Sequence, residues 1–479
     1  MKINILSVSL IGSSILGVIG LISTIKYPFG FIFHSAIFLS LIGVVGLLAY
    51  AAFKLFKGSI IKKIIAALLS VFILIILSVA TIGFTDVRIL MPSVSAKTMT
   101  KEQWVEDFDF LDKSLQKHPS FNDSLAIVLD AYKSNIENLP KISDHQALIT
   151  SMRMVSLFKD GHSNLVPFQL YTRTRYLPIQ VYDFEDGIFI TKSTNKELIG
   201  GKIVAINNQM IDTISKKITP LIGADNSFFA KYQSSLYIPN MDVLKGLDIL
   251  SSKKEVSLKI LINGELITKK LKSISMIKWL IWSLSPSEDI RPVGHNIRNA
   301  DNLVQVKNDT LIWMTFNKTG PEDILTDIGK KITDQEYGKG INHLVIDMRN
   351  NTGGDNSSYN ELIKHLSKSN IEISLLSSRK TFSAGINFIS ELKLARDFQI
   401  IGEPTGAGHN HYGNPQTLFL PNSGIMLSLS TREWSFIPEL IDKSILPDIW
   451  VSYPSSEYFK QEDPWLRALV TKHKLGTEE

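Results

Sequence analysis

Three long apolar stretches at the start of the chain limit its fold more than any other feature. They run over about residues 4–24, 30–53 and 64–84. Each is close to the roughly 20 residues that a helix needs to cross the hydrocarbon core of a bilayer. Residues 1–84 contain six lysines and no aspartate, glutamate or arginine. The sequence therefore predicts a membrane anchor of three transmembrane helices over residues 1–84.

The lysines between these stretches predict an orientation. Four of them separate the second and third stretches, whereas the first connection contains only Lys26. Basic loops stay in the cytoplasm. The N-terminus is therefore expected inside and everything after residue 84 outside the cytoplasm. A cleaved signal peptide is the alternative for the first stretch, but that run is long and lacks a small-residue cleavage site.

Charge and cysteine content exclude several classes of protein. Removing the six early lysines from the 51 basic residues leaves 45 against 46 acidic ones, so the rest of the chain is near neutral (45 − 46 = −1). A nucleic-acid partner would favour a basic face and is not expected. The chain has no cysteine, which excludes disulfides, thiolate metal sites and a cysteine nucleophile.

Residues 97–165 are expected to form a helical subdomain. Thr100 and Gln103 have the spacing of a capping box, and apolar residues follow at helical spacing. Two further helices are predicted over about 123–139 and 144–158. Over residues 166–290 the sequence pattern instead predicts short strands with alternating polar and apolar residues. Within them the stretch 200–208 resembles part of a PDZ domain, although an ordinary β-hairpin explains it equally well, so a degenerate PDZ-like β module is predicted here.

Residues 291–479 alternate between strands and helices and predict an α/β domain. A largely apolar strand over 344–348 is expected to be buried on both faces of a sheet. Gly353 and Gly354 follow this strand and precede a predicted helix over 357–366. Such glycines let the backbone approach a bound group, and nearby amides favour developing negative charge. An ordinary strand-to-helix turn is the alternative interpretation.

Two further short motifs suggest a nucleophile and a base. Ser383 is followed by Ala384, Gly385 and a stretch compatible with a helix. This arrangement is typical of a nucleophile elbow, although an isolated serine before a helix is more often an N-cap. His162 lies in the sequence Asp160-Gly161-His162-Ser163. A single histidine is more often a satisfied structural residue than a base.

Together these motifs, in this order, resemble the tail-specific (C-terminal-processing) and tricorn-type serine peptidases over roughly residues 97–455. Stretches 402–406 and 446–451 are also similar to family signatures. The resemblance implies a helical cap, a PDZ-like module and a crotonase-like (ClpP-like) α/β peptidase core. One branch of the family uses a lysine about 25 residues after the serine, but Gly408 occupies that position here. The tricorn-like Ser–His branch is therefore the closer resemblance.

That resemblance implies roles for particular residues. Ser383 would be the nucleophile and His162 its general base, with the amides of Gly353 or Gly354 and of Ala384 binding the oxyanion. An acidic residue would orient the histidine. We favour Glu433, which follows a predicted strand over 425–430, and Glu439 and Asp442 stay open as alternatives.

No metal or other cofactor is predicted. His409 and His411 have no acidic partner beside them in the sequence. The sequence thus predicts a membrane-anchored serine peptidase that hydrolyses peptides or proteins outside the cytoplasm, without nucleic acid. A catalytically inactive peptide-binding membrane protein and an esterase that uses the same site are the alternatives.

Overall fold

The computed structural model describes residues 99–166, 174–285 and 302–473, all within one compact unit, Ser95–Glu479. In these three ranges no helix is both long and apolar enough to cross a membrane. The longest, α5, has 16 residues, fewer than the roughly 20 required. The fold-class prediction of transmembrane helices is therefore contradicted. The three apolar stretches over 4–84 lie outside the described residues, and the cytoplasmic N-terminus and extracytoplasmic catalytic domain stay predictions.

The first described part is helical, as the sequence predicts. It contains α4 (Lys101–Leu115), α5 (Asp123–Asn138) and α6 (Asp144–Ser156). The capping box of Thr100 and Gln103 is confirmed at the start of α4, and Ser143 and Gln146 form a second one before α6. These boxes satisfy amides at the helix N-termini that have no intrahelical partner. Local sequence signals therefore fix where both helices begin.

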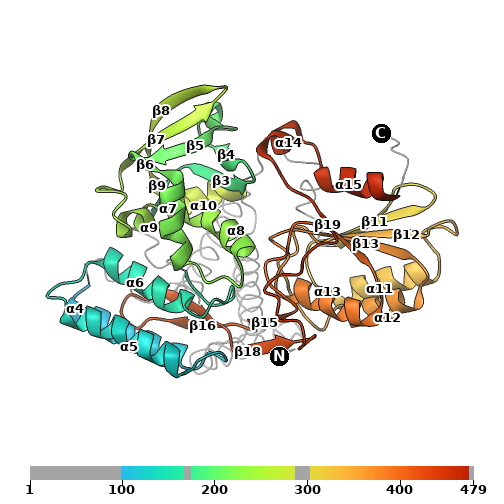
Figure 1. The fold of residues 1–479 in the computed structure, drawn as a ribbon, viewed down its shortest axis with the longest axis horizontal. Coiled ribbons are helices and arrows are strands. Elements are labelled where there is room, and N and C mark those ends of the chain that lie inside the picture. Colours follow the sequence, from blue (N-terminus) through green and yellow to red (C-terminus); the bar gives the residue numbers. More distant parts are fainter. Residues whose placement is uncertain (1–98, 167–173, 286–301, 474–479) are drawn as a thin grey trace, which may run out of the picture. The chain divides into compact units, whose positions relative to one another are not determined.

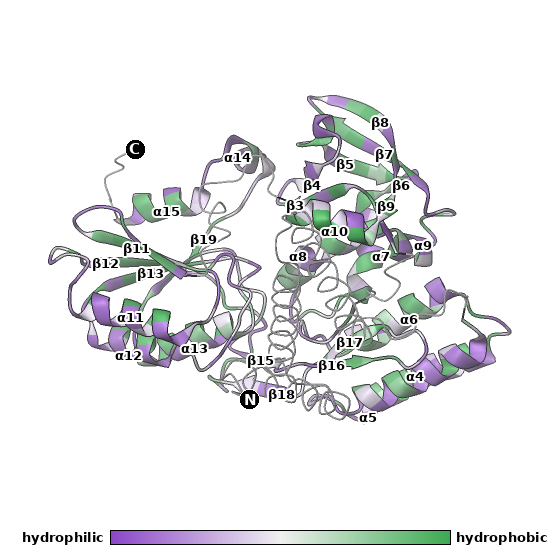
Figure 2. Cartoon of the chain, turned by 180° about the vertical axis from the view of Figure 1, so that it is seen from behind, coloured by the Kyte–Doolittle hydropathy of each residue, from purple (hydrophilic) through white to green (hydrophobic). Residues whose placement is uncertain are grey.

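A six-stranded sheet with flanking helices forms the C-terminal part (Figure 1). Its strands, in sheet order, are β10 (Asn302–Val306), β11 (Leu311–Phe316), β12 (His343–Asp347), β13 (Glu372–Ser377), β14 (Gln399–Gly402) and β19 (Ile449–Trp450). β10 is antiparallel to β11, and the other neighbours are parallel. Figure 2 shows β11, β12 and β13 as apolar, which is typical of strands buried on both faces.

Helices cover both faces of this sheet, as Figure 1 shows. The helices of this part are α11 (Glu322–Thr333), α12 (Asn360–Lys368), α13 (Ala384–Ala395), α14 (Ser455–Lys460) and α15 (Pro464–His473). Side chains of α11, α12 and α13 share one buried apolar core with the sheet. Trp465 and Leu469 of α15 are buried in a second core on the opposite face. An α/β core therefore lies where the sequence predicted it.

An antiparallel sheet forms the middle of the chain, in the order β3-β4-β5-β7-β8, with β6 paired to β5. Its strands are β3 (Ile179–Phe184), β4 (Gly187–Ser193), β5 (Lys202–Ile206), β6 (Gln209–Met210), β7 (Glu255–Ile262) and β8 (Glu265–Lys272). Asn207 and Asn208 turn the chain between β5 and β6 with positive φ angles of 46° and 65°. Such angles are typical of a tight hairpin turn, and β5 and β6 form a short antiparallel hairpin around these two residues.

Four helices accompany this sheet, and the strand pattern of the sequence did not predict them. They are α7 (Ile211–Ile218), α8 (Ser227–Tyr237), α9 (Met241–Gly246) and α10 (Met276–Leu284). The remaining short strands form three smaller sheets, in the orders β1-β17-β16, β15-β18 and β2-β9. These are β1 (Asn164–Val166), β2 (Arg175–Tyr176), β9 (Ile274–Ser275), β15 (Asn410–Gly413), β16 (Gln416–Phe419), β17 (Met426–Leu429) and β18 (Arg432–Ser435). β1 pairs with β17, so the helical part and the C-terminal part share a sheet. The predicted domain boundaries themselves stay predictions.

Candidate active site

Two loops of the candidate site leave the same edge of the six-stranded sheet. β12 and β13 are parallel neighbours, so the loops that follow their carboxyl ends emerge side by side. The first loop contains Gly353 and Gly354, and the second ends at Ser383. The amide of Phe382 donates to the carbonyl oxygen of Asn351 at 3.0 Å, which ties the two loops together. The sheet topology therefore brings the predicted oxyanion glycines to the predicted nucleophile.

Ser383 has an unusual backbone conformation, with φ 55° and ψ −130°. Residues other than glycine rarely adopt such angles, and they persist only where the surrounding structure enforces them. α13 begins at the next residue, but the Ser383 side chain makes no capping hydrogen bond to that helix. Ser383 therefore occupies the N-cap position of α13, but its hydroxyl does not cap the helix. A strained turn between strand and helix instead presents a half-buried hydroxyl that caps nothing.

The backbone amides around Ser383 differ in their availability. The Gly353 amide donates to Asn351 Oδ1 at 2.9 Å. Within the described part of the chain, the amides of Gly354 and Ala384 donate to no other residue. Gly353 nevertheless lies against the serine, because a Cβ at that position would be 3.0 Å from Ser383 Oγ. The glycine pair thus leaves space beside the hydroxyl, and its second amide is available to a ligand.

His162 reaches this site from the turn between α6 and β1. Its ring stacks on Phe382, the neighbour of Ser383, with centroids 4.4 Å apart and planes 27° apart. The side chain is buried, and neither ring nitrogen has a hydrogen-bond partner among residues 99–166, 174–285 and 302–473. The structure therefore brings His162 to the turn of Ser383, although no hydrogen bond joins the two side chains. A buried ring with two unpaired nitrogens requires an explanation.

Asp160 is the carboxylate that lies against His162. Its Oδ1 is 3.7 Å from His162 Nδ1 and accepts the His162 backbone amide at 2.9 Å. Its Oδ2 accepts the Ser163 hydroxyl at 2.5 Å. Asp160 belongs to the sequence motif of His162, but no role was predicted for it. Its position two residues before the histidine was the available signal.

A second histidine completes the surroundings of Asp160. His118 Nε2 lies 3.1 Å from Asp160 Oδ2, and the Ser120 amide donates to His118 Nδ1 at 3.1 Å. Because Nδ1 accepts, the proton of the neutral ring is on Nε2, which therefore donates to Asp160. Burial opposes ionisation of Asp160, but the hydrogen bonds from His118 and Ser163 and the neighbouring His162 hold its pKa well below the usual range.

Asp225 is a second acidic residue at this turn, and it is half-buried. Its Oδ2 accepts the Gly161 amide at 2.9 Å. Burial and the charge of nearby Asp160 raise the pKa of Asp225 to about 7. Near neutral pH, Asp160 is therefore ionised, whereas Asp225 is partly protonated.

The three acidic residues considered as partners of His162 lie elsewhere. Glu433 is exposed on β18, opposite Tyr412, and Glu439 is exposed in the following segment. Asp442 is half-buried, and its Oδ1 is buried without a partner in the described structure. Burial lowers the pKa of His409, and the charge of Asp442 opposes that shift. The choice among these three residues stays a prediction, because no described contact joins any of them to His162.

The two later histidines lie near the site but form no metal centre. His411 stacks near His162 with centroids 5.9 Å apart, and burial together with His162 lowers the His411 pKa to about 3. His409 Nδ1 lies 2.8 Å from Ser390 Oγ. The described ranges contain no group of three histidine, cysteine or acidic residues that could hold a metal ion.

Solved structures of other proteins have a fold similar to that of this chain. Neither a protein-family model nor a curated protein matches the sequence. Mature CPAF in complex with lactacystin is similar with a TM-score of 0.54 and 12% identity, covering 78% of this chain and 98% of that chain. A point mutant of CPAF gives a TM-score of 0.55 and 13% identity, with 78% and 97% covered.

The tricorn protease matches with a TM-score of 0.34 and 14% identity over 78% of this chain and 36% of that chain. So low a TM-score carries no argument, and the tricorn-like branch stays a proposal. Over 78% of its length, this chain therefore has the same fold as mature CPAF.

Proposed function

We propose that this chain is a serine peptidase that hydrolyses peptide bonds through Ser383, with His162 as its general base. The backbone of Ser383 carries the proposal. Its strained turn presents a hydroxyl that makes no capping hydrogen bond, and strain of this kind concentrates at functional sites. The buried, unpaired nitrogens of the adjacent His162 support the same assignment.

The proposed reaction follows from these groups. Ser383 Oγ attacks the carbonyl carbon of a peptide bond, and its proton moves to His162 Nε2. The amides of Ala384 and Gly354 stabilise the oxyanion that forms. The carbon–nitrogen bond then breaks as His162 gives its proton to the leaving amine. Water repeats the sequence on the acyl-serine ester, which releases the acid and restores the hydroxyl.

Asp160 serves as a positioning residue in this proposal. Its carboxylate lies 3.7 Å from His162 Nδ1 and is itself held by Ser163 and His118. It favours the tautomer with a proton on Nδ1, which leaves Nε2 free to accept the serine proton. The hydrogen bond from Ser383 to His162 is expected to form with substrate, since such bonds are often long in unliganded enzymes.

Labelling with a fluorophosphonate probe tests the nucleophile. The wild-type chain should become labelled, and Ser383→Ala should abolish the label. Ser367→Ala is a matched control, because Ser367 is exposed on α12 and bonds only a backbone carbonyl. Labelling that persists in Ser383→Ala would show that the nucleophile lies elsewhere.

The alternatives give different results in the same assay. A chain that is never labelled and cleaves no peptide library is a binding protein without catalysis. The missing hydrogen bond between Ser383 and His162 is the observation that favours that alternative. A labelled chain that cleaves ester libraries but no peptides is an esterase.

A further inference from the structure

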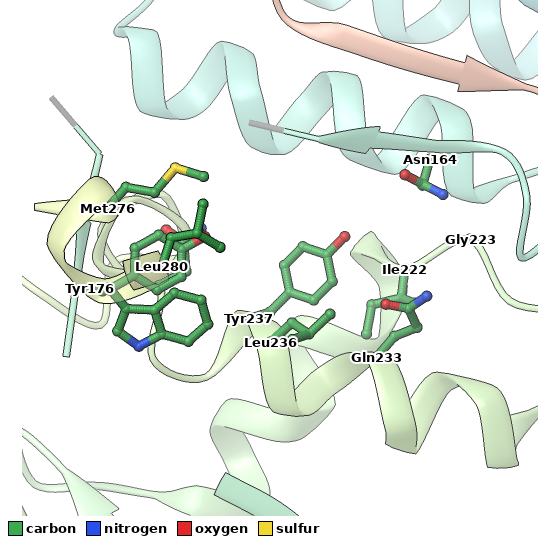
Figure 3. Close-up of a pocket in the computed structure, with 11 residues that line it drawn as sticks. Asn164, Tyr176, Ile222, Gly223, Gln233, Leu236, Tyr237, Met276 and Leu280 are labelled. Carbon is green, nitrogen blue, oxygen red and sulfur yellow. The ribbon is translucent and has the colours of Figure 1, made fainter. Parts of the chain in front are cut away.

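A separate apolar cavity lies behind the turn that carries His162. Its volume is about 340 Å³, at the lower end of the range for ligand-binding pockets. Tyr176, Trp279, Leu236 and Leu280 supply much of its wall. Among the described residues, no charged side chain lines it. Figure 3 shows the ring of Tyr237 between Leu280 on one side and Ile222 on the other.

Two polar side chains in this cavity have no partner. Neither the Gln233 amide nor the Tyr237 hydroxyl makes a hydrogen bond to any residue in the described ranges, although both line the cavity. Burial alone raises the pKa of Tyr237 to about 12. An amide supplies two donors and one acceptor, and a phenol supplies one donor and an acceptor. This set matches the N–H and C=O groups of a peptide backbone inside an otherwise apolar wall.

The cavity is joined to the catalytic turns by rigid elements. Gly223, on its wall, packs so closely on the histidine turn that a Cβ there would be 2.1 Å from the Ser163 carbonyl oxygen. Phe229 stacks on Phe382 with centroids 4.1 Å apart, and Tyr237 lies two turns further along α8. Eight helical residues span roughly 12 Å, which an extended peptide covers with about four residues.

We propose that this cavity binds a large apolar side chain of the peptide substrate, about four residues from the bond that is cleaved. The apolar wall takes the side chain, and Gln233 and Tyr237 bond the adjoining peptide groups. The inference rests on the proposed function, because a peptide occupant is expected of a chain that acts on peptides. An uncharged lining disfavours acidic or basic side chains at this position.

Binding to the full chain with Ser383→Ala separates this proposal from catalysis, since no turnover is needed. The probes are acetylated, amidated pentapeptides Ala-Ala-X-Ala-Ala with phenylalanine, alanine or glutamate at X, measured by titration calorimetry. The phenylalanine peptide should bind at least about tenfold more tightly than the alanine peptide. The glutamate peptide should bind no better than alanine. Equal affinities for phenylalanine and alanine would overturn the proposal, whatever the fluorophosphonate result.

Substitutions in and outside the cavity test whether the pentapeptides bind there. Leu236 is 48% exposed at the rim of the cavity, so Leu236→Glu should remove the preference for phenylalanine without unfolding the chain. Leu266→Glu is the matched control, because Leu266 is 62% exposed on β8 and outside the cavity lining. Tyr237→Phe keeps the ring and should weaken every peptide that binds by about threefold to tenfold.

Two outcomes contradict the proposal. A preference for phenylalanine that survives Leu236→Glu would place the apolar subsite elsewhere. Binding of 1-octanol that is lost in Leu236→Glu, with no binding of any pentapeptide, would make the occupant a small apolar molecule. Thermal unfolding of each variant identifies any that fail to fold, and Tyr237→Phe then provides the independent comparison.

Discussion

A methyl group added at Gly353 would lie 2.6 Å from Ser383 Cβ and 3.0 Å from its Oγ. The φ angle of 111° at Gly353 also disfavours any side chain. Gly353→Ala should therefore displace Ser383 and reduce kcat/KM for peptide cleavage by at least about 100-fold. The backbone strain should also cost about 1–3 kcal/mol of unfolding free energy, measured by chemical denaturation.

Gly264 provides the matched control. Its φ angle is 81°, and a Cβ there would meet nothing within 4 Å. Gly264→Ala should carry a similar strain cost but leave peptide cleavage unchanged. Equal activity of the two variants after correction for the folded fraction would contradict a catalytic role of Ser383 that depends on its close contact with Gly353.

Asp160 is the second residue whose role can be tested alone. Asp160→Asn keeps the shape of the side chain but removes the negative charge that we propose orients His162. We expect kcat to fall by on the order of 10²- to 10⁴-fold, with KM nearly unchanged, measured by steady-state kinetics. A purely structural role would instead lower the folded fraction and leave the kcat of the remaining folded enzyme intact.

Asp107→Asn is the control that separates a loss of stability from a specific loss of kcat. Asp107 is also buried and accepts the backbone amides of Asn422 and Ser423, but it has no described contact with His162. Its replacement should reduce stability without a specific loss of kcat. If both variants lose activity only in proportion to their folded fraction, Asp160 does not position the histidine.

At the scale of elements, the loop before α8 packs on the turn that carries His162. Gly223 lies against the carbonyl oxygens of Asp160 and Ser163, and Asp225 Oδ2 accepts the Gly161 amide at 2.9 Å. Burial, reinforced by the charge of Asp160, raises the Asp225 pKa to about 7. The contact between these two elements should therefore depend on pH.

The sign of that dependence follows from the raised pKa. Between about pH 4 and pH 7 the folded chain holds a proton on Asp225 that the unfolded chain has released, so this group lowers stability as pH rises. Asp225→Asn removes the effect. The unfolding free energy of Asp225→Asn minus that of wild type should increase between about pH 4 and pH 7, by at most about 4 kcal/mol. Above pH 7 this difference should stay constant. Denaturation curves at several pH values measure it, and a constant difference would contradict the raised pKa.

Local signals predicted some elements and missed others for physical reasons. The capping box of Thr100 and Gln103 acts within one helical turn, so the start of α4 could be predicted from the sequence. α8 could not, because its buried face is defined by tertiary neighbours such as Phe382. The partner of His118 lies 42 residues away in the chain. No spacing rule relates such residues, so the contact between His118 and Asp160 could not be predicted from the sequence.

At the scale of the whole molecule, residues that separate local motifs single out lie close together around Ser383. Ser383, His162 and Gly353 come from three segments that the sheet topology and the stacking on Phe382 bring together. The motifs indicated these residues because each loop has a recognisable local form. The acidic candidates lacked such a form, since Glu433, Glu439 and Asp442 follow a strand at spacings that no motif fixes.

A buried charge cluster joins helix α15 to the six-stranded sheet. Arg349, which is 1% exposed, donates to Asp347 at the end of β12 and to both oxygens of Asp463 at 2.8 Å. Asp463 in turn accepts the amide of Trp465 at the start of α15. Arg349→Met would leave two buried carboxylates without their cation. A broken buried pair of this kind costs about 3–5 kcal/mol.

We therefore expect Arg349→Met to lower the unfolding free energy by about that amount, measured by chemical denaturation. Arg467→Met is the control, because Arg467 on α15 has a side chain that is 58% exposed and pairs with Glu457. That exposed pair should contribute less than about 1 kcal/mol. Similar losses in the two variants would mean that the buried cluster does not hold α15 on the sheet. A large loss only in Arg349→Met would show that the C-terminal helix and the loop leading to Gly353 are stabilised by the same charge.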